Sequence, residues 1–282
     1  MREERTLDPR KESGRKRERG GPGSAGGPAK RTGEEPGQRM NDKVYIHEFI
    51  DITRQNRARY MHHMAANWSP LAQETRHQLC YGVWGVVGST GRWPQVVNIW
   101  EEDGFAGLAG NFRAEVGNPV LQDPALAKWW AAAAELRSGG FDRLIVPHPD
   151  TATIEELTSA RVTGEAYAHE IVAVRPGTAR EFLDAALADA AATAAIHGWQ
   201  LTGAWHTAMR GDDEAILLWT IPTWEQWAAV EHQLAAGPQD VLLPGSRDAI
   251  LSRHRILLAD SPLCPFRTGR QPNRADRTDW VD

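Results

Sequence analysis

The chain has 282 residues, of which 41% are hydrophobic and 24% are charged, and its net charge is −5 at pH 7. These values are ordinary for a globular protein with one large domain or two small ones. No apolar run approaches the ~18 residues that a membrane-spanning helix needs. Two cysteines are too few for a disulfide framework or a zinc site. Because the sequence also shows no secretory signal, we expect a cytoplasmic protein.

Residues 1–39 differ in composition from the rest of the chain. They contain one Leu and no Val, Ile, Phe, Trp or Tyr, with 11 Lys and Arg against 7 Asp and Glu. Such a segment cannot bury enough apolar surface to offset the ordering of the chain, so we predict a disordered tail. A basic tail can contact nucleic acid, but solvation alone explains this composition, and we expect no nucleic-acid partner.

Residues 40–160 show a strand, helix, strand, strand, helix, strand order with one additional helix. Alternating strand formers predict strands at 44–52, 79–87, 94–100 and 141–147. Helical spacing, Pro and Asp predict helices at 55–65, 69–78, 105–112 and 123–136. Gly139-Gly140 is expected to end the last helix before the fourth strand begins.

Residues 161–260 repeat this order with fewer insertions. Strands are predicted at 166–174, 201–209, 215–221 and 255–259, and helices at 178–196 and 223–234. Residues 261–282 are rich in Pro, Arg and Asp, and we expect an irregular C-terminal tail that wraps the surface.

The two units share sequence as well as order. The stretch VYIHEFI at 44–50 recurs as AYAHEIV at 166–172, and the motif at 82–84, GVW, recurs as GAW at 203–205. This internal duplication predicts an α+β fold made of tandem ferredoxin-like βαββαβ units. A sheet of this kind has one bare apolar face, so two sheets placed face to face form an intramolecular dimeric α/β barrel. We therefore expect a monomer, with homodimerisation as a further option.

The fold pattern resembles that of the dimeric α/β-barrel superfamily, and the chain is most similar to NIPSNAP-like proteins with two fused units. The resemblance covers residues 42–260 and rests on the stretches 44–48, 81–94, 96–101 and 161–170. It implies a barrel with a ligand cavity, as in relatives that are cofactor-independent monooxygenases, cyclases, isomerases, haem enzymes or plain ligand binders. A shared fold does not choose among these activities.

Alternation along the first strand of each unit places Tyr45 with His47, and Tyr167 with His169, on one face. We expect this face to line the cavity, because the helix-covered face should require aliphatic packing. His47 and His169 are then candidate acid–base groups, since a neutral imidazole exchanges protons near neutral pH. The alternative is that both are packed histidines bonded to the backbone or to Tyr.

Glu48 and Glu170 lie on the opposite face of the same strands. A buried carboxylate is costly unless it is paired. Arg143 and Arg255, which the repeat places at equivalent positions of the fourth strands, are the expected partners. If the glutamates face the cavity instead, they replace the histidines as candidate bases.

Further candidates are weaker. His206 has no histidine counterpart in the first unit and is a third acid–base candidate. Asn98 is able to donate a hydrogen bond to a substrate carbonyl. The remaining ligand-binding candidates are strand aromatics, whose alternative role is core packing: Tyr45, Tyr167, Trp84, Trp205, Trp100 and Trp219.

The sequence thus predicts a small-molecule enzyme that acts on an apolar, aromatic or polyketide-like substrate between the two sheets. Acid–base chemistry fits cofactor-independent oxygenation, cyclisation or isomerisation. A non-catalytic ligand-binding or interaction protein is the alternative from a different class. We expect no cofactor and no metal, and haem with a histidine as its axial ligand is the alternative.

Overall fold

The computed structural model describes residues 40–237 and 240–278. The tail predicted at 1–39 lies outside the described residues, as does the end of the C-terminal tail.

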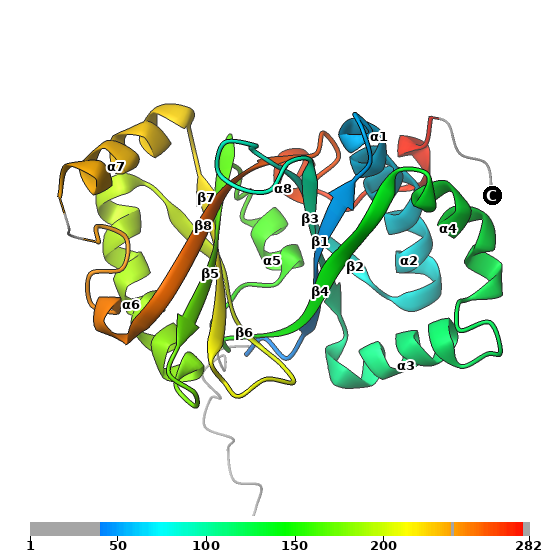
Figure 1. The fold of residues 1–282 in the computed structure, drawn as a ribbon, viewed down its shortest axis with the longest axis horizontal. Coiled ribbons are helices and arrows are strands. Elements are labelled where there is room, and N and C mark those ends of the chain that lie inside the picture. Colours follow the sequence, from blue (N-terminus) through cyan, green and yellow to red (C-terminus); the bar gives the residue numbers. More distant parts are fainter. Residues whose placement is uncertain (1–39, 238–239, 279–282) are drawn as a thin grey trace, which may run out of the picture. The chain divides into compact units, whose positions relative to one another are not determined.

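Within these residues, eight antiparallel strands close into one barrel in the order β1-β3-β2-β8-β5-β7-β6-β4 (Figure 1). The first four strands have the order β4-β1-β3-β2 and the last four the order β8-β5-β7-β6, and the two sets meet where β2 pairs with β8 and β4 with β6. The strands are β1 Val44–Ile52, β2 Leu79–Val86, β3 Gln95–Glu102, β4 Arg137–Pro147, β5 Ala166–Val174, β6 Gln200–Thr207, β7 Glu214–Ile221 and β8 Ile250–Asp260. The prediction of an α+β fold with eight strands is confirmed.

Helices pack on the outer faces of both sets of strands (Figure 1). Those beside the first set are α1 Arg57–His62, the π-helical η1 His63–Trp68, α2 Ser69–Arg76, α3 Gly104–Val116, the 3₁₀ turn η2 Pro124–Leu126 and α4 Ala127–Ala134. Those beside the second set are α6 Ala179–His197, α7 Trp224–Ala236 and the 3₁₀ turn η3 Arg247–Ala249. Three short elements complete the chain, namely α5 Ile154–Ser159, α8 Pro265–Thr268 and the 3₁₀ turn η4 Arg274–Asp276.

The fourth strand is longer than the sequence predicted. β4 begins at Arg137, so Gly139 and Gly140 lie inside the strand and do not end a helix. A Cβ at Gly140 would lie 2.4 Å from the carbonyl oxygen of Phe49 on the neighbouring strand β1. Glycine is therefore needed here for close approach of two strands, a role that a sequence pattern does not separate from helix termination.

Aromatic side chains fill the inside of the barrel. Tyr45, Tyr81, Trp84, Tyr167 and Trp205 are fully buried in one cluster. Their rings meet edge to face, with centroids 5.5 Å apart for Tyr45 and Tyr81 and 5.7 Å for Trp84 and Tyr167. The space between the two sheets, which we expected to be the ligand cavity, is therefore a packed core where these rings meet.

Two short helices add to this core. Ile154 and Leu157 of α5 and Phe266 of α8 belong to the same buried cluster, and both helices lie between the two sets of strands in Figure 1. The sequence did not predict α5, although Thr153 and Glu156 form a capping box at its start. The segment that we expected to be an irregular tail on the surface contains α8, and Phe266 of this helix is buried against Tyr81.

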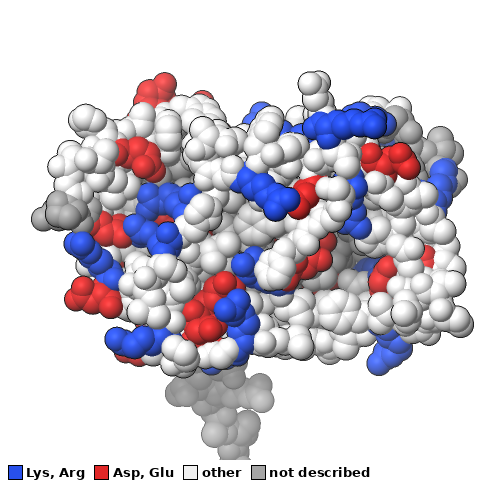
Figure 2. Space-filling model, in the orientation of Figure 1, with Lys and Arg blue, Asp and Glu red and all other residues white. Residues whose placement is uncertain are grey.

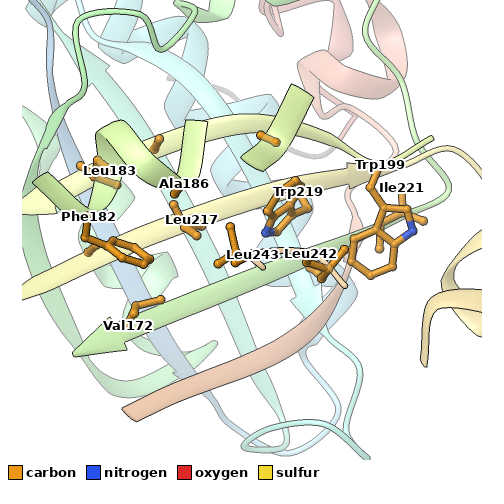
Figure 3. Close-up of a cluster of buried hydrophobic side chains, with 14 of the residues drawn as sticks. Val172, Phe182, Leu183, Ala186, Trp199, Leu217, Trp219, Ile221, Leu242 and Leu243 are labelled. Carbon is orange, nitrogen blue, oxygen red and sulfur yellow. The ribbon is translucent and has the colours of Figure 1, made fainter. Parts of the chain in front are cut away.

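The outer face of the second set of strands is closed by α6. Phe182, Leu183 and Ala186 of this helix pack with Leu217 and Trp219 of β7 (Figure 3), and all are buried. Trp219 is therefore a core residue under a helix, which is the alternative role that we considered for it.

Charged side chains of both signs are interspersed on the surface drawn in Figure 2. Neither sign gathers there into one large patch. No helix among the described residues is long and apolar enough to cross a membrane.

Candidate functional site

A pocket of about 570 Å³ lies on the outer face of the first set of strands. Its floor is formed by Ile46 and Glu48 of β1 and Trp100 of β3. Its walls come from η1, α2, α3, α4 and β4, and the segment that follows β6 borders it. The outer face of the sheet therefore borders a pocket in the first half, whereas α6 covers the matching face in the second half. The aromatic and sulfur side chains of the lining are Met64, Trp68, Trp100, Phe112, Trp129, Trp130, Phe141 and Met209.

Glu48 is the carboxylate of this floor. Its Oε2 accepts two hydrogen bonds, from Asn98 Nδ2 at 2.9 Å and from the indole Nε1 of Trp100 at 2.8 Å. The side chain is half-buried and lines the pocket. Two donors thus hold one carboxylate oxygen and fix the orientation of the group toward the pocket.

Burial raises the pKa of Glu48, and the charge of Asp142 raises it further, while the bonds from Trp100 and Asn98 lower it. Asp142 lies directly opposite Glu48 in the pairing of β1 with β4, so the two acids share a face of the sheet. Burial also raises the pKa of Asp142, and the nearby guanidinium of Arg137 lowers it. The pocket therefore contains two neighbouring carboxyl groups that both bind a proton more readily than they do in water.

Asn98 is fully buried and does not line the pocket. Its Nδ2 donates to Glu48 and to the hydroxyl oxygen of Tyr60 at 3.2 Å. Both amide hydrogens are thus directed at protein atoms. The expected contact of Asn98 with a substrate carbonyl does not fit this geometry, and its role is to position Glu48.

The second half keeps a tryptophan, Trp219, at the position of Trp100 but differs at the positions of Asn98 and Asp142. Glu170 lies opposite Arg255 in the pairing of β5 with β8 and opposite Leu217 in the pairing with β7. Arg255 Nε donates to Glu170 Oε1 at 2.5 Å, and Arg253 lies 3.8 Å from the other oxygen. The predicted ion pair is confirmed for Glu170, which is fully buried under α6.

The predicted partner of Glu48 was wrong. Arg143 lies opposite His47, one position from the site opposite Glu48, and its Nε donates to Glu214 Oε1 at 2.9 Å. Asp142 is the counterpart of Arg255. The sequence alignment of the two fourth strands was shifted by one residue, and a shift of one residue in a strand exchanges its two faces.

His47 and His169, which occupy matching positions of the repeat, meet inside the barrel. Their rings are stacked with centroids 4.9 Å apart, and their Nε2 atoms are 2.9 Å from each other. Both side chains are fully buried. Burial lowers the pKa of both, that of His169 to about 3, and the charge of Arg143 adds to the effect. Neither residue lines the pocket; they contact each other and Phe49.

The remaining candidates are distributed over other parts of the fold. His206 is buried on β6, where its Nε2 lies 3.1 Å from Nη2 of Arg180, and burial followed by the charge of Arg180 lowers its pKa. It joins neither the histidine pair nor the pocket. Of the six aromatic candidates only Trp100 lines the pocket. Those that pack inside the barrel are Tyr45, Tyr167, Trp84 and Trp205.

Sequence reasoning missed several residues of the site. Tyr60 lies in a helix that the sequence did predict, and the adjacent Trp129 and Trp130 of α4 were an available signal for a pocket wall. Arg137 and Asp142 were missed because the predicted fourth strand began four residues too late and out of register.

The pocket does not fit haem held by a histidine. Among the described residues that line it there is no His, Cys or Tyr. The side chains of the lining that contain sulfur are Met64 and Met209. The Nε2 atoms of the predicted histidine ligands face each other or Arg180. The described part of the chain also contains no group of three or more His, Cys, Asp and Glu side chains placed to hold a metal ion.

Solved structures share this architecture. An anthrone oxidase-like protein is similar with a TM-score of 0.54 and 12% identity, over 78% of this chain and 92% of that one. A candidate monooxygenase from Lactobacillus acidophilus NCFM is similar with a TM-score of 0.51 and 9% identity, over 83% and 97%. The fold is that of the dimeric α/β barrels. No family model matches the sequence, and a search among curated proteins found no significant match.

Proposed function

We propose that this dimeric α/β barrel is a small-molecule enzyme, and that Glu48 is its general acid–base group in the pocket of the first half. The observation that carries the proposal is the difference between two matching positions. Glu48 faces Asp142 beside a pocket, whereas Glu170 faces Arg255 under a helix. Only the first arrangement leaves a carboxyl group free to exchange protons with a ligand.

The electrostatics of Glu48 suit this role. An acid–base group works best when its pKa lies near the working pH, and burial beside Asp142 moves Glu48 in that direction. Asn98 and Trp100 hold Oε2, so the other oxygen is the one directed at the substrate. The carboxyl group of Glu48 thus has a fixed orientation and a raised pKa, as a positioned catalytic carboxyl should have.

The lining supports an apolar, aromatic or polyketide-like substrate. Trp100, Trp129 and Trp130 give flat walls, and a volume near 570 Å³ accommodates a molecule of several fused rings. The guanidinium of Arg137 lies 4.8 Å above the ring of Trp130 and near both carboxyl groups. It supplies positive charge that stabilises an enolate or phenolate after the proton has left.

The chemistry that follows is proton abstraction from an acidic C–H or O–H group, without a bound cofactor. Proton abstraction begins an isomerisation, a cyclisation or a reaction of the resulting carbanion with oxygen. An anthrone oxidase-like protein and a candidate monooxygenase share the fold of this chain, and their names fit a reaction of this kind. The similarity itself is one of fold.

Hydrogen–deuterium exchange tests the proposal without knowledge of the complete reaction. The purified protein is incubated in D₂O with a panel of enolisable aromatic ketones and anthrones, and exchange at carbon is followed by NMR. We expect catalysed exchange that falls at least about a hundredfold in Glu48→Gln. Glu170→Gln is the matched control and should retain the rate per folded molecule. A ligand that binds with no catalysed exchange would instead favour a non-catalytic binding protein.

We infer further that the chain is a tandem of two ferredoxin-like units, 40–160 and 161–260, that closes the barrel within one monomer. The support is the identical strand order of the two halves and the matched positions of His47 and His169. The narrower assignment to NIPSNAP-like proteins rests on the sequence stretches alone. Expression of 40–160 alone should yield a self-associating species, because its inner sheet face is bare, and size-exclusion chromatography with light scattering measures this.

A further inference from the structure

A second pocket, of about 400 Å³, lies near the seam where β2 meets β8, away from Glu48. Arg57 and Met61 of α1 form one wall, and Trp93 of the β2–β3 hairpin forms another. Residues 259–263, which include the end of β8, complete it. None of these residues belongs to the site proposed above.

Arg57 is the charged group of this pocket that lacks a counter-ion. Its Nη1 donates to the carbonyl oxygen of Val86 at 2.9 Å, and its guanidinium lies 4.3 Å above the ring of Trp93. Among the described residues no carboxylate pairs with it, and burial lowers its pKa. A partly buried cation without an opposite charge is costly.

Three other shielded arginines of this fold are neutralised. Arg76 pairs with two carboxylates, Arg143 with Glu214, and Arg255 with Glu170. Arg57 has no such carboxylate partner among the described residues, so its charge is available to a ligand.

Asp260, an acidic residue in the lining of this pocket, does not neutralise Arg57. Asp260 Oδ1 accepts from Arg267 at 2.5 Å, and Oδ2 accepts from the hydroxyl of Tyr167 at 3.4 Å. Its carboxylate is thus engaged by other groups. The guanidinium of Arg57 therefore has N–H donors that no described carboxylate accepts.

Two glycines hold the arrangement in place. A Cβ at Gly85 would lie 3.2 Å from Cδ of Arg57, and a Cβ at Gly88 would lie 2.8 Å from the ring of Trp93. The absence of side chains at these two positions lets Arg57 and Trp93 approach the backbone closely, with the guanidinium 4.3 Å from the centre of the Trp93 ring. This geometry fixes the guanidinium fork, which recognises planar carboxylates by paired hydrogen bonds.

We infer that this pocket binds a small organic carboxylate with an apolar ring. The guanidinium of Arg57 takes the carboxylate, and Met61, Trp93 and Leu263 contact the ring. The inference is independent of the activity proposed for Glu48.

Calorimetric titration of the full chain with sodium benzoate tests it. We expect saturable binding that weakens at least about tenfold in Arg57→Gln and by less in Arg57→Lys, which keeps the charge but loses the fork. Acetate should bind more weakly than benzoate because it lacks the ring, and inorganic phosphate should compete poorly.

Arg92→Gln is the matched control, because Arg92 is exposed in the same hairpin and pairs with Asp51. Its affinity for benzoate should equal that of the wild type. Melting temperatures establish that each variant is folded. Absence of benzoate binding in the wild type, or equal binding in Arg57→Gln, would overturn the inference, as would tighter binding of phosphate than of benzoate.

Discussion

The indole ring of Trp84 lies over Gly82, two residues earlier on the same strand. A Cβ placed on Gly82 would fall 2.0 Å from the ring, and a Cβ on Gly203 would fall 1.7 Å from the ring of Trp205. Each tryptophan folds back along its own strand into the space that a glycine leaves. The repeated Gly-x-Trp motif is therefore a packing unit of the barrel core, used once in each half.

This relationship predicts that Gly82→Ala destabilises the protein strongly. The added methyl group cannot coexist with the ring of Trp84, and a packed core has no room to move it. We expect the free energy of unfolding to fall by about 1–3 kcal/mol, measured by urea denaturation. Gly211→Ala is the control, since a Cβ there meets nothing within 4 Å, and its stability should change by less than about 0.5 kcal/mol. Equal stability of the two variants would contradict the packing described here.

The buried histidine pair predicts a loss of stability in mild acid. The folded state keeps His47 and His169 neutral, because their pKa values are lowered, whereas the unfolded chain protonates them near pH 6.5. The unfolded state therefore binds more protons as the pH falls from about 6.5 toward 3, and stability decreases over this window. Each histidine contributes up to about 1.4 kcal/mol per pH unit.

Urea denaturation between pH 7.5 and pH 4.5 measures this effect. The variant His169→Gln cannot protonate at that position, so its stability should fall less steeply with pH than that of the wild type. Parallel pH profiles for the two proteins would show that the histidines do not control acid stability.

The two matching glutamates predict opposite effects on stability. Glu170→Gln removes the charge that neutralises Arg255, and we expect the free energy of unfolding to fall by roughly 3–5 kcal/mol. Burial raises the pKa of Glu48, so its ionised form is less stable in the fold than in water at neutral pH. Glu48→Gln removes that cost and keeps an oxygen acceptor for Asn98 and Trp100. Its stability at pH 7 should equal or exceed that of the wild type, by the same denaturation assay. A large loss in Glu48→Gln would indicate a structural and not a catalytic role.

The sequence was sufficient for the number and order of the strands, because these depend on local alternation and on the repeat. It was not sufficient for the position of the pocket. The face of β1 that carries Glu48 has the same pattern as the face of β5 that carries Glu170, yet one lies under a pocket and the other under α6. That difference arises from how the helices pack, which is a tertiary property.

The sequence was also not sufficient for the register of the fourth strand of each half. The repeat equated Arg143 with Arg255, whereas the strand pairing equates Asp142 with Arg255. A one-residue error is invisible in a short strand with few apolar residues, and it moved the arginine onto the wrong face. Tyr45 and His47 do lie inside the barrel and Glu48 on the opposite face, but the pocket is on that opposite face and not between the two sheets.

The last prediction concerns Asn98, whose counterpart in the second half is Leu217. Asn98→Leu gives the first half the residue of the second and removes one of the two N–H donors to Glu48 Oε2. Because that bond favours the ionised form, its loss should raise the pKa of Glu48 further. If Glu48 acts as a base, the acid limb of the pH–rate profile for deuterium exchange should move to higher pH. Trp100→Phe removes the other donor and should move the limb in the same direction. The maximal rate above this limb should change less than it does in Glu48→Gln, since the base itself is retained. An unshifted profile with a lowered rate at every pH would show that Asn98 supports the pocket without acting through Glu48.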